Sequence, residues 1–389
     1  MYLSKKSLVK KIVLISLLIS ISFCGSFAQS GSSPLRISVL TCAPGLELYS
    51  TFGHTAIRII DSSRQTDLVY NYGTFDFSDP DFYSKFTRGK LDYFLSVAPL
   101  EDFMYEYRSE NRDVHEQVLA ANDSTKQIIQ QALTENLAGP ARYYKYDFLY
   151  NNCTSRVRDI LMKYAGLKAD QPLVPAGTSF RDMLHEYLDK GNQAWSKLGI
   201  DLVLGSPIDR KANISESMFL PDYLMKGIDS SVHNPSSIVL QEKIRINLGN
   251  GQQEPFRNTP LILFSVLAIV AGMITFLKHK VAITLTKFLD FFLFLVTGLI
   301  GCLLLFMWFG TDHAACAANY NLLWALPCNL VAAFAVWKRP AWLQQYFTVY
   351  AMILLATLLG WFWQPQELNT ALIPVCLWLL FRSNQLRKK

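Results

Sequence analysis

The stretch TFGHTAIRII at residues 51–60 decides the fold of the first half of the chain. A glycine turn comes first, and the residues from His54 to Ile60 then place apolar side chains in the alternating pattern of a β-strand. Two neighbouring stretches, LRISVLT at residues 35–41 and DLVYNY at residues 67–72, are also rich in strand-forming residues. The sequence therefore predicts a sheet in this region, with His54 at the start of one of its strands.

Three later stretches predict helices around this sheet, at residues 100–111, 123–137 and 153–164. The last of them, CTSRVRDILMKY, has apolar residues at helical spacing. A strand-rich part followed by helices is typical of an α+β domain. We therefore expect an α+β domain at residues 29–257, with linkers at 31–34 and 249–254.

The composition shows that the whole chain is not a soluble protein. Of its 389 residues, 51% are hydrophobic and only 17% are charged, whereas an ordinary soluble domain carries about 25% charged residues. The apolar surplus lies after residue 260, which excludes a purely soluble enzyme, a disordered protein and a nucleic-acid-binding module. The net charge of +6 comes largely from basic clusters beside apolar segments, so it indicates membrane orientation and not a nucleic-acid partner.

The C-terminal third predicts an all-α membrane domain of about five spans at residues 258–389. A spanning helix needs about 20 mostly apolar residues, and the candidate spans are 259–277, 288–309, 322–337, 346–363 and the shorter 371–381. Lys and Arg are concentrated at residues 278–287, 338–339 and 382–389, but none occurs in the loops 310–321 and 364–370. This alternation places the two uncharged loops on the outer face of the membrane.

The N-terminus predicts a signal peptide at residues 1–28. Four lysines precede the apolar stretch 12–23, and the small residues Ser26 and Ala28 come directly before the expected cleavage point. An uncleaved anchor is the alternative. Cys24 is typical of a lipoprotein signal, but the bulky Phe23 before it argues against that interpretation. In every case the region after Gln29 is exported.

A cysteine opens the predicted helix at residues 153–164, in the segment YNNCTS at 150–155. A helix N-terminus lowers the pKa of a thiol and binds an oxyanion, and a histidine nearby can act as a general base. Cys153 and His54 therefore provide the minimum needed for cysteine-dependent acyl transfer. Two alternatives stay open: His54 is a structural strand residue, or Cys153 forms a disulfide with Cys42, the only other cysteine of the expected exported domain.

At these residues the chain resembles the bacterial lipoprotein N-acyltransferase family called Lnb. Four ordered motifs at residues 41–59, 70–77, 85–95 and 150–161 carry the resemblance: TCAPGLELYSTFGHTAIRI, YNYGTFDF, KFTRGKLDYFL and YNNCTSRVRDIL. The order of histidine before cysteine is similar to circularly permuted papain-like folds, which include NlpC-type peptidases and relatives of lecithin–retinol acyltransferase. The resemblance covers about residues 36–220 by motif and the whole chain by architecture.

The resemblance implies a role for each of three residues. Cys153 is expected to be the nucleophile and His54 its base. Permuted papain-like enzymes add a polar residue that orients the histidine, and Asn71, on the strand after His54, is expected to fill that position. An amide oxygen that accepts a hydrogen bond from one imidazole N–H leaves the other ring nitrogen for the thiol.

Five further residues are expected to bind substrate. Asn152 and Arg156 flank the cysteine. Arg156 lies close to one helical turn after it, where it can meet a lipid phosphate, although a solvated surface arginine is the alternative. Ser50 is expected in the wall of the site. The outer loop at 310–321 carries His313 and Asn319, which are expected to help place a head group or the acceptor amine, although an ordinary interfacial loop is the alternative.

The expected function is ping-pong acyl transfer at the inner (cytoplasmic) membrane, with the catalytic domain in the periplasm. A membrane phospholipid donates the acyl chain, a thioester forms on the cysteine, and the N-terminal amine of a lipoprotein accepts the chain. No metal, cofactor or nucleic acid is expected. The alternatives are a periplasmic cysteine peptidase or amidase acting on peptidoglycan, and a disulfide-stapled envelope protein without enzymatic activity.

Overall fold

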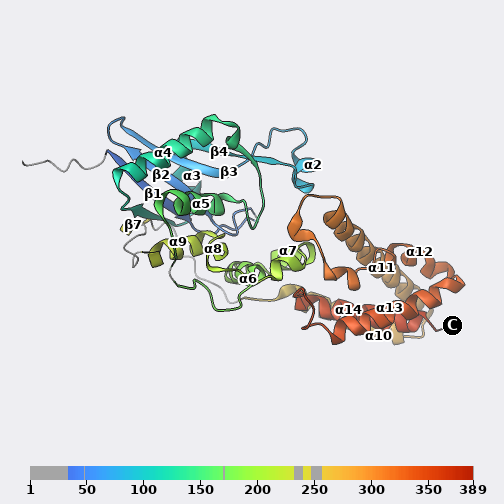
Figure 1. Cartoon of the computed structure of the whole chain (residues 1–389). Coiled ribbons are helices and arrows are strands. Elements are labelled where there is room, and N and C mark those ends of the chain that lie inside the picture. Colours follow the sequence, from blue (N-terminus) through green and yellow to red (C-terminus); the bar gives the residue numbers. More distant parts are fainter. Residues whose placement is uncertain (1–33, 48, 170, 232–239, 247–255, 389) are drawn as a thin grey trace, which may run out of the picture. The chain divides into compact units, whose positions relative to one another are not determined.

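The computed structural model describes residues 34–388, except for residues 48, 170, 232–239 and 247–255 (Figure 1). The predicted signal peptide at 1–28 lies outside the described residues, as do residue Cys24 and most of both predicted linkers.

An antiparallel sheet forms the centre of the first half of the chain (Figure 1). Within the described residues it has seven strands in the order β6-β4-β3-β2-β1-β5-β7, and every neighbouring pair is antiparallel. The three predicted strands are confirmed as β1, β2 and β3. The strands are β1 Leu35–Cys42, β2 His54–Asp61, β3 Thr66–Thr74, β4 Asp92–Pro99, β5 Val114–Leu119, β6 Tyr143–Lys145 and β7 Leu240–Ile246.

Helices follow or interrupt these strands. The three predicted helices are confirmed as α3 Leu100–Ser109, α4 Asp123–Ala138 and α5 Cys153–Ala165. The others in this half are α2 Phe82–Thr87, α6 Phe180–Lys190, α7 Ala194–Val203, α8 Ile214–Ser217 and α9 Pro221–Ser230. The expected combination of a sheet with surrounding helices is therefore present.

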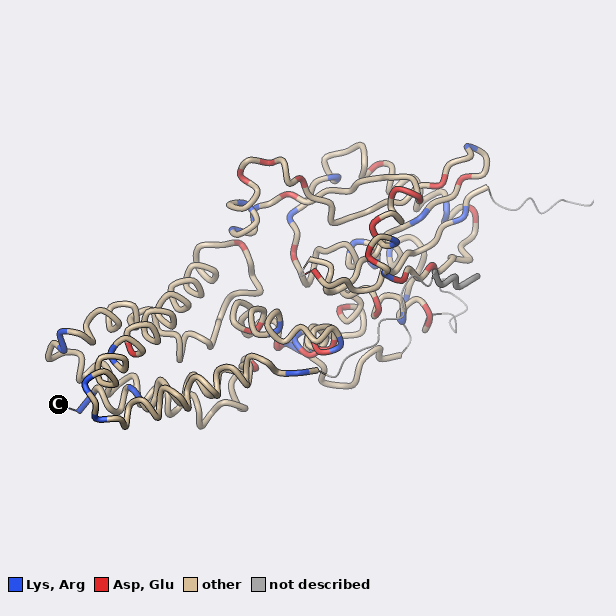
Figure 2. Tube along the Cα trace, turned by 180° about the vertical axis from the view of Figure 1, so that it is seen from behind, with Lys and Arg blue, Asp and Glu red and all other residues tan. Residues whose placement is uncertain are grey.

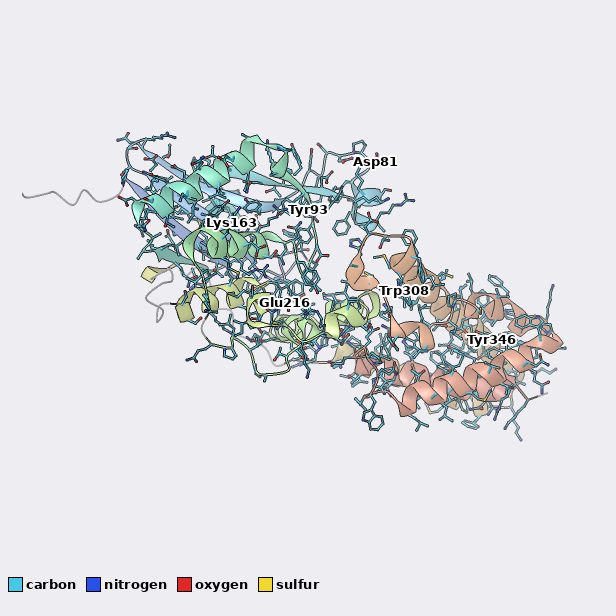
Figure 3. The ribbon with its side chains drawn as sticks, viewed as in Figure 1. Asp81, Tyr93, Lys163, Glu216, Trp308 and Tyr346 are labelled. Atoms are coloured by element: carbon cyan, nitrogen blue, oxygen red, sulfur yellow. The ribbon has the colours of Figure 1, made fainter. Side chains whose placement is uncertain are left out.

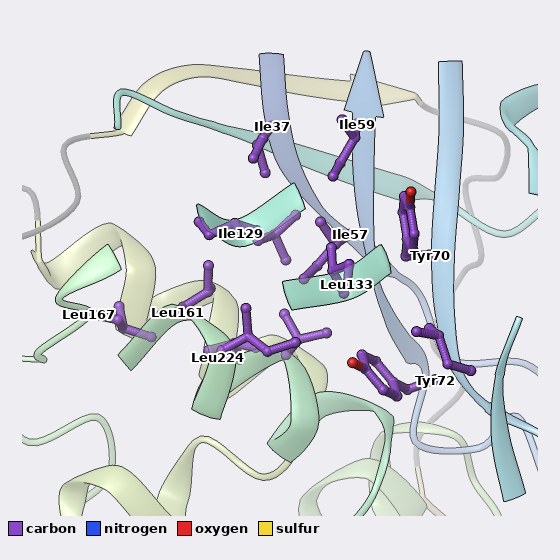
Figure 4. Packing of buried hydrophobic residues seen from close by; sticks show 14 of the residues in the cluster. Ile37, Ile57, Ile59, Tyr70, Tyr72, Ile129, Leu133, Leu161, Leu167 and Leu224 are labelled. Atoms are coloured by element: carbon purple, nitrogen blue, oxygen red, sulfur yellow. The ribbon is translucent and has the colours of Figure 1, made fainter. Parts of the chain in front are cut away.

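Both faces of the sheet are buried, because successive side chains of a strand point to opposite faces. On β1, Ile37 and Val39 belong to the larger core, which also contains residues of α4, α5 and α9. Figure 4 shows this core, with Ile57 and Tyr72 of the sheet turned towards the helices. The alternate residues of β1 belong to a smaller core with α3 on the other face. The sheet thus places α5 against one of its faces.

The second half of the chain is helical, and three of its helices are long and apolar enough to cross a membrane. These are α10 Thr259–Phe276, α11 Lys280–Phe309 and α13 Ala341–Leu359. Figure 2 shows few charged residues along the middle of these helices and several Lys and Arg near the end that carries the C-terminus. The Lys and Arg clusters at 278–287, 338–339 and 382–389, from which the orientation is predicted, agree with this distribution.

The other two predicted spans form shorter helices, so five full spans are not confirmed. In place of the span expected at 322–337, the short helical turn Tyr320–Leu323 precedes α12 Asn329–Lys338, which has only 10 residues. Pro327 lies between them and interrupts the helix. The last predicted span becomes α14 Ile373–Leu386, with 14 residues. At 1.5 Å per residue, α12 covers about 15 Å, half of a bilayer core of about 30 Å.

The two predicted outer loops hold the carboxyl end of α7. The last carbonyl groups of a helix have no partner within it. Here four side-chain amides donate to this helix end: Asn319 to the Leu202 and Val203 carbonyls, Asn321 to Asp201, Gln366 to Leu204, and Asn369 to the Asp201 carboxylate.

A buried ion pair completes this junction. Arg181 of α6 donates from Nη1 to Oδ1 of Asp201 at 2.7 Å, and both side chains are almost fully buried. His185 lies 2.8 Å from the same oxygen. Burial raises the pKa of the Asp201 carboxyl, but His185 and Arg181 outweigh that effect and hold it below its ordinary value. Asp201 therefore stays ionised and links α6, α7 and the outer loops.

Loss of this carboxylate is expected to destabilise the protein strongly. Asp201→Ala leaves Arg181 with Asp209 as its one remaining carboxylate partner within the described residues. It also takes the acceptor from the buried donors of Arg181 and Asn369, and each buried donor without an acceptor costs about 1–3 kcal/mol. Asp189→Ala is the matched control, since Asp189 pairs with Lys197 at a more exposed site and is expected to cost at most about 1 kcal/mol. Thermal unfolding of the full chain in detergent measures both, and equal effects would contradict the structural role of Asp201.

Candidate active site

His54 is the first residue of β2 because a tight turn ends directly before it. The Gly53 N–H donates to the Ser50 carbonyl at 3.0 Å. Gly53 has a φ of +73°, and a Cβ at this position would lie 2.5 Å from the Cys42 carbonyl oxygen. Only glycine fits there. The turn thus fixes the point at which the chain enters the strand, and with it the position of the imidazole.

Cys153 is the first residue of α5 because Asn152 caps the helix. The Asn152 side chain accepts from the Ser155 N–H at 2.8 Å, and the Ser155 hydroxyl accepts from the Asn152 N–H at 2.8 Å. This capping box fixes the start of the helix. The Asn152 amide nitrogen also donates to the carbonyls of Phe148 and Phe219, so its polar atoms are all used within the protein.

A buried hydrogen bond joins the two elements that carry the cysteine and the histidine. The hydroxyls of Thr55 and Thr154 lie 3.0 Å apart, and each threonine directly follows one member of the pair. Neither threonine is among the site residues predicted from the sequence. Their adjacency to His54 and Cys153 in the two motifs was the available signal, but their contact across the fold was not visible in the sequence.

The structure brings Cys153, His54 and Asn71 together. Nε2 of His54 lies 2.5 Å from Oδ1 of Asn71, and the Cys153 thiol forms a hydrogen bond with the His54 side chain. An amide oxygen only accepts hydrogen bonds, so Nε2 carries the proton in this contact. The remaining ring nitrogen, Nδ1, is then the one that serves the thiol.

A bulge in β3 lets the strand pass close to the sulfur. The register between β3 and β4 shifts between Asn71 and Thr74. Gly73, within the bulge, has a φ of +91°, and a Cβ there would lie 3.4 Å from the Cβ of Cys153. Bulges commonly re-aim side chains beside functional sites. Here the bulge follows Asn71 and brings the backbone against Cys153.

The surroundings of Cys153 favour its thiolate form. Partial burial raises the pKa of the thiol, but the positive charge of His54, the hydrogen bond from His54 and the backbone N–H of Thr55 lower it to about 7. Burial lowers the pKa of His54, yet the negative Cys153 more than compensates and raises it above its ordinary value. The thiolate of Cys153 and the protonated form of His54 therefore stabilise each other.

Cys42 is the second thiol of this half of the chain, and it is not bonded to Cys153. Both cysteines are free, and Cys42 is completely buried. Burial raises the pKa of the Cys42 thiol to about 12. Cys42 pairs with His54 across the β1–β2 register. Its thiol therefore remains protonated and unreactive beside a reactive one.

The residues expected to bind substrate occupy different kinds of position. Arg156 is half-buried, donates from Nε to the Asn151 side chain at 2.6 Å, and lies with its guanidinium 4.0 Å from the centre of the Tyr144 ring. Ser50 is 4% exposed and donates to the Glu47 carbonyl at 3.1 Å. Asn152 is the helix cap described above. None of these contacts tests a role in binding.

The two expected residues of the outer loop also contact the protein. His313 places Nε2 3.1 Å from the carbonyl oxygen of Phe86. Asn319 is 3% exposed and holds the end of α7. Both residues therefore contribute to contacts of the outer loop with the rest of the chain, and their roles in substrate binding stay predictions.

Alkylation of Cys153 is expected to follow the lowered pKa of its thiol. Reactivity with iodoacetamide should be half-maximal near pH 7 and fall as the thiolate is protonated at lower pH. In His54→Ala the positive charge is lost and burial remains, so the midpoint should move to higher pH. The pH profile of the modified Cys153 peptide, measured by mass spectrometry, checks this, with Cys153→Ser as the background. An unshifted midpoint in His54→Ala would contradict the ion pair.

Family models identify both halves of the chain. The chain matches no curated protein and no solved structure. Residues 27–186 match the family model for the Lnb N-terminal periplasmic domain, and residues 251–388 match the model for the Lnb transmembrane domain. The family expected from the four motifs is thus confirmed. Because the two matches follow one another and together span most of its length, the chain belongs to the Lnb family, with a periplasmic and a transmembrane domain.

Proposed function

We propose that the protein is a lipoprotein N-acyltransferase with a cysteine nucleophile, a multi-pass protein of the inner membrane whose catalytic domain lies in the periplasm. The observation that carries the proposal is the cluster of Cys153, His54 and Asn71 at the start of α5. Membership of the Lnb family supports the acyltransferase class and a lipoprotein substrate. The order of histidine before cysteine supports a permuted papain-like arrangement of the site.

The first half-reaction transfers an acyl chain from a phospholipid to the cysteine. The Cys153 proton passes to Nδ1 of His54, and the thiolate attacks an ester carbonyl carbon of the donor lipid. The backbone N–H of Cys153, which has no partner within the helix at this first position, supports the oxyanion together with the positive end of α5. The ester C–O bond then breaks, the imidazolium returns its proton to the departing lysophospholipid oxygen, and a thioester remains.

The second half-reaction transfers the chain to the lipoprotein. The α-amine of the lipid-modified N-terminal cysteine attacks the thioester carbonyl, and His54 accepts the amine proton. The C–S bond breaks, an amide forms, and Cys153 leaves as a thiolate. A thioester suits this step because an amine opens it more readily than an oxygen ester. No step requires a metal or a diffusible cofactor.

The transmembrane domain supplies the setting for both steps. Donor and acceptor are each confined to the membrane, so an enzyme anchored there meets them at a high effective concentration. Among the residues expected to bind substrate, we assign the phosphate of the donor to Arg156. Its guanidinium is one helical turn beyond Cys153 and is held in place by Asn151 and the Tyr144 ring. A positioned guanidinium is well suited to bidentate binding of phosphate.

The two alternatives are weaker on specific grounds. The free thiols of Cys42 and Cys153 disfavour a disulfide-stapled envelope protein. A peptidase or amidase acting on peptidoglycan would use the same Cys153 and His54, but a soluble substrate gives no reason for several long apolar helices. Cleavage of peptidoglycan stem peptides by the purified protein, without N-acylation of a lipopeptide, would favour the peptidase.

Removal of either reacting group is expected to abolish acyl transfer. Cys153→Ser and His54→Ala should lower the rate by at least about 10²–10⁴-fold, since each removes the nucleophile or its base. The measurement is formation of N-acylated product from a diacylglyceryl lipopeptide and phospholipid by the full-length protein. Near wild-type activity in either variant, at equal membrane abundance, would contradict the mechanism.

Asn71 is expected to act by positioning the imidazole. Asn71→Ala should reduce the maximal rate by about tenfold and change half-saturation little, because the ring then loses its preferred tautomer and orientation. Asn71→Asp keeps an acceptor oxygen and should recover much of the rate. Gln131→Ala, an exposed amide on α4, is the matched control. An unchanged rate in Asn71→Ala would remove this residue from the site.

A further inference from the structure

The segment between β3 and β4, residues 75–91, exposes several large aromatic side chains. Phe77 is 71% exposed, Tyr83 79% and Phe86 50%. Arg88 and Lys90, in the same segment, are also exposed. Clustered apolar side chains at a surface mark an interaction site, and aromatic residues next to basic ones are typical of protein surfaces that lie at a membrane interface.

Two hydrogen bonds connect this segment to the outer end of a membrane helix. The Asp312 N–H donates to the Arg88 carbonyl at 2.9 Å, and His313 contacts the Phe86 carbonyl. Asp312 and His313 are the third and fourth residues after Phe309, the last residue of α11. The Phe309 side chain is 72% exposed. Figure 3 labels Trp308 on α11, and Trp308 stacks on Phe309 with ring centroids 4.7 Å apart. The exposed aromatics of residues 75–91 thus belong to a segment that contacts the residues following α11.

From this surface a continuous series of rings leads to the cysteine. Ring centroids are separated by 6.0 Å from Phe86 to Phe82, 5.7 Å from Phe82 to Phe75, 5.3 Å from Phe75 to Tyr93 and 4.4 Å from Tyr93 to Tyr146. Figure 3 labels Tyr93 on β4.

The inner end of the series reaches the reactive sulfur. Tyr146, Phe75 and Cys153 all pack against the same hydrophobic core, and Tyr146 is close enough to Cys153 to be affected by its charge. Gly73 lies two residues before Phe75, and a Cβ built on it would lie 3.4 Å from the Cβ of Cys153. The rings therefore form a continuous apolar series from the exposed surface to the neighbourhood of the thiol.

We propose that residues 75–91 insert into the outer leaflet of the membrane and that an acyl chain of a glycerophospholipid lies along the ring series Phe86, Phe82, Phe75 and Tyr93 to reach Cys153. The inference rests on the proposed function, since it assigns the route of the donor chain. The ester carbonyl then arrives at the sulfur with its glycerol and phosphate beside Arg156, and the acyl chain extends back along the rings towards the bilayer. Arg88 and Lys90 lie at the head-group level.

Direct contact with lipid is tested without any chemistry at the cysteine. The full-length Cys153→Ser protein, with p-benzoyl-phenylalanine replacing Phe77 or Phe86, is irradiated in vesicles of phosphatidylethanolamine and phosphatidylglycerol. Lipid adducts, measured by mass spectrometry, are expected at both positions at several times the yield seen at Tyr105. Tyr105 is 75% exposed on α3 and serves as the matched control. Equal yields at all three positions would overturn the proposed insertion.

The route itself is tested with two donors. Phe77→Ser, Tyr83→Ser and Phe86→Ser combined should slow acylation of Cys153 by vesicle phospholipid at least about tenfold. Acylation by the water-soluble p-nitrophenyl acetate should be unchanged, and Tyr105→Ser should affect neither reaction. An unchanged rate with vesicle lipid, or equal losses with both donors, would overturn the route.

Failure of this inference and failure of the proposed function are distinguishable. If the wild-type protein acylates a lipopeptide but no lipid adducts form at Phe77 and Phe86, the proposed function is supported and the aromatic route is wrong. If lipid adducts form at these positions but no lipopeptide is acylated, the membrane contact is supported and the proposed acyl transfer is wrong.

Discussion

The contact between the start of α5 and the first residues of β2 is the interaction on which the rest of the site depends. The Asn152 cap fixes where the helix begins, and the Gly53 turn fixes where the strand begins. The buried hydrogen bond between Thr55 and Thr154 then sets the distance between the two elements. With both starting points fixed, the thiol and the imidazole have little freedom, and each stabilises the charged form of the other.

Polar contacts also connect the loops of the transmembrane half to the first half of the chain. The outer loops use their amides to hold the end of α7, and Asp201 joins that helix to Arg181 of α6. Directly after α11, His313 and its neighbour contact residues 75–91. The polar groups at this boundary therefore satisfy backbone groups, and the aromatic surface is left exposed beside them. In our account, a rigid connection at α7 and an aromatic contact with lipid together keep the reactive sulfur near the bilayer.

Sequence patterns predicted the local features of this protein well. Alternating apolar residues identified β1 and β2, and a high content of strand-forming residues identified β3. The resemblance to permuted papain-like enzymes pointed to Asn71, on the strand after His54, as the partner of the imidazole. Hydropathy was less reliable for the membrane half. It located all the apolar segments, but it could not show that Pro327 and a short helical turn reduce one expected span to α12. Contacts between residues far apart in the chain, such as the Thr55–Thr154 bond and the ring series, leave no periodic pattern and emerged only from the fold.

The central claim is that Cys153 carries the acyl chain during transfer. Intact mass spectrometry of the full-length protein incubated with phospholipid, without acceptor, tests it most directly. The account predicts a mass increase of one acyl chain that hydroxylamine removes, that maps to Cys153 and that is absent from Cys153→Ala. An unmodified Cys153 after incubation with lipid, while the same preparation still N-acylates a lipopeptide, would contradict the account.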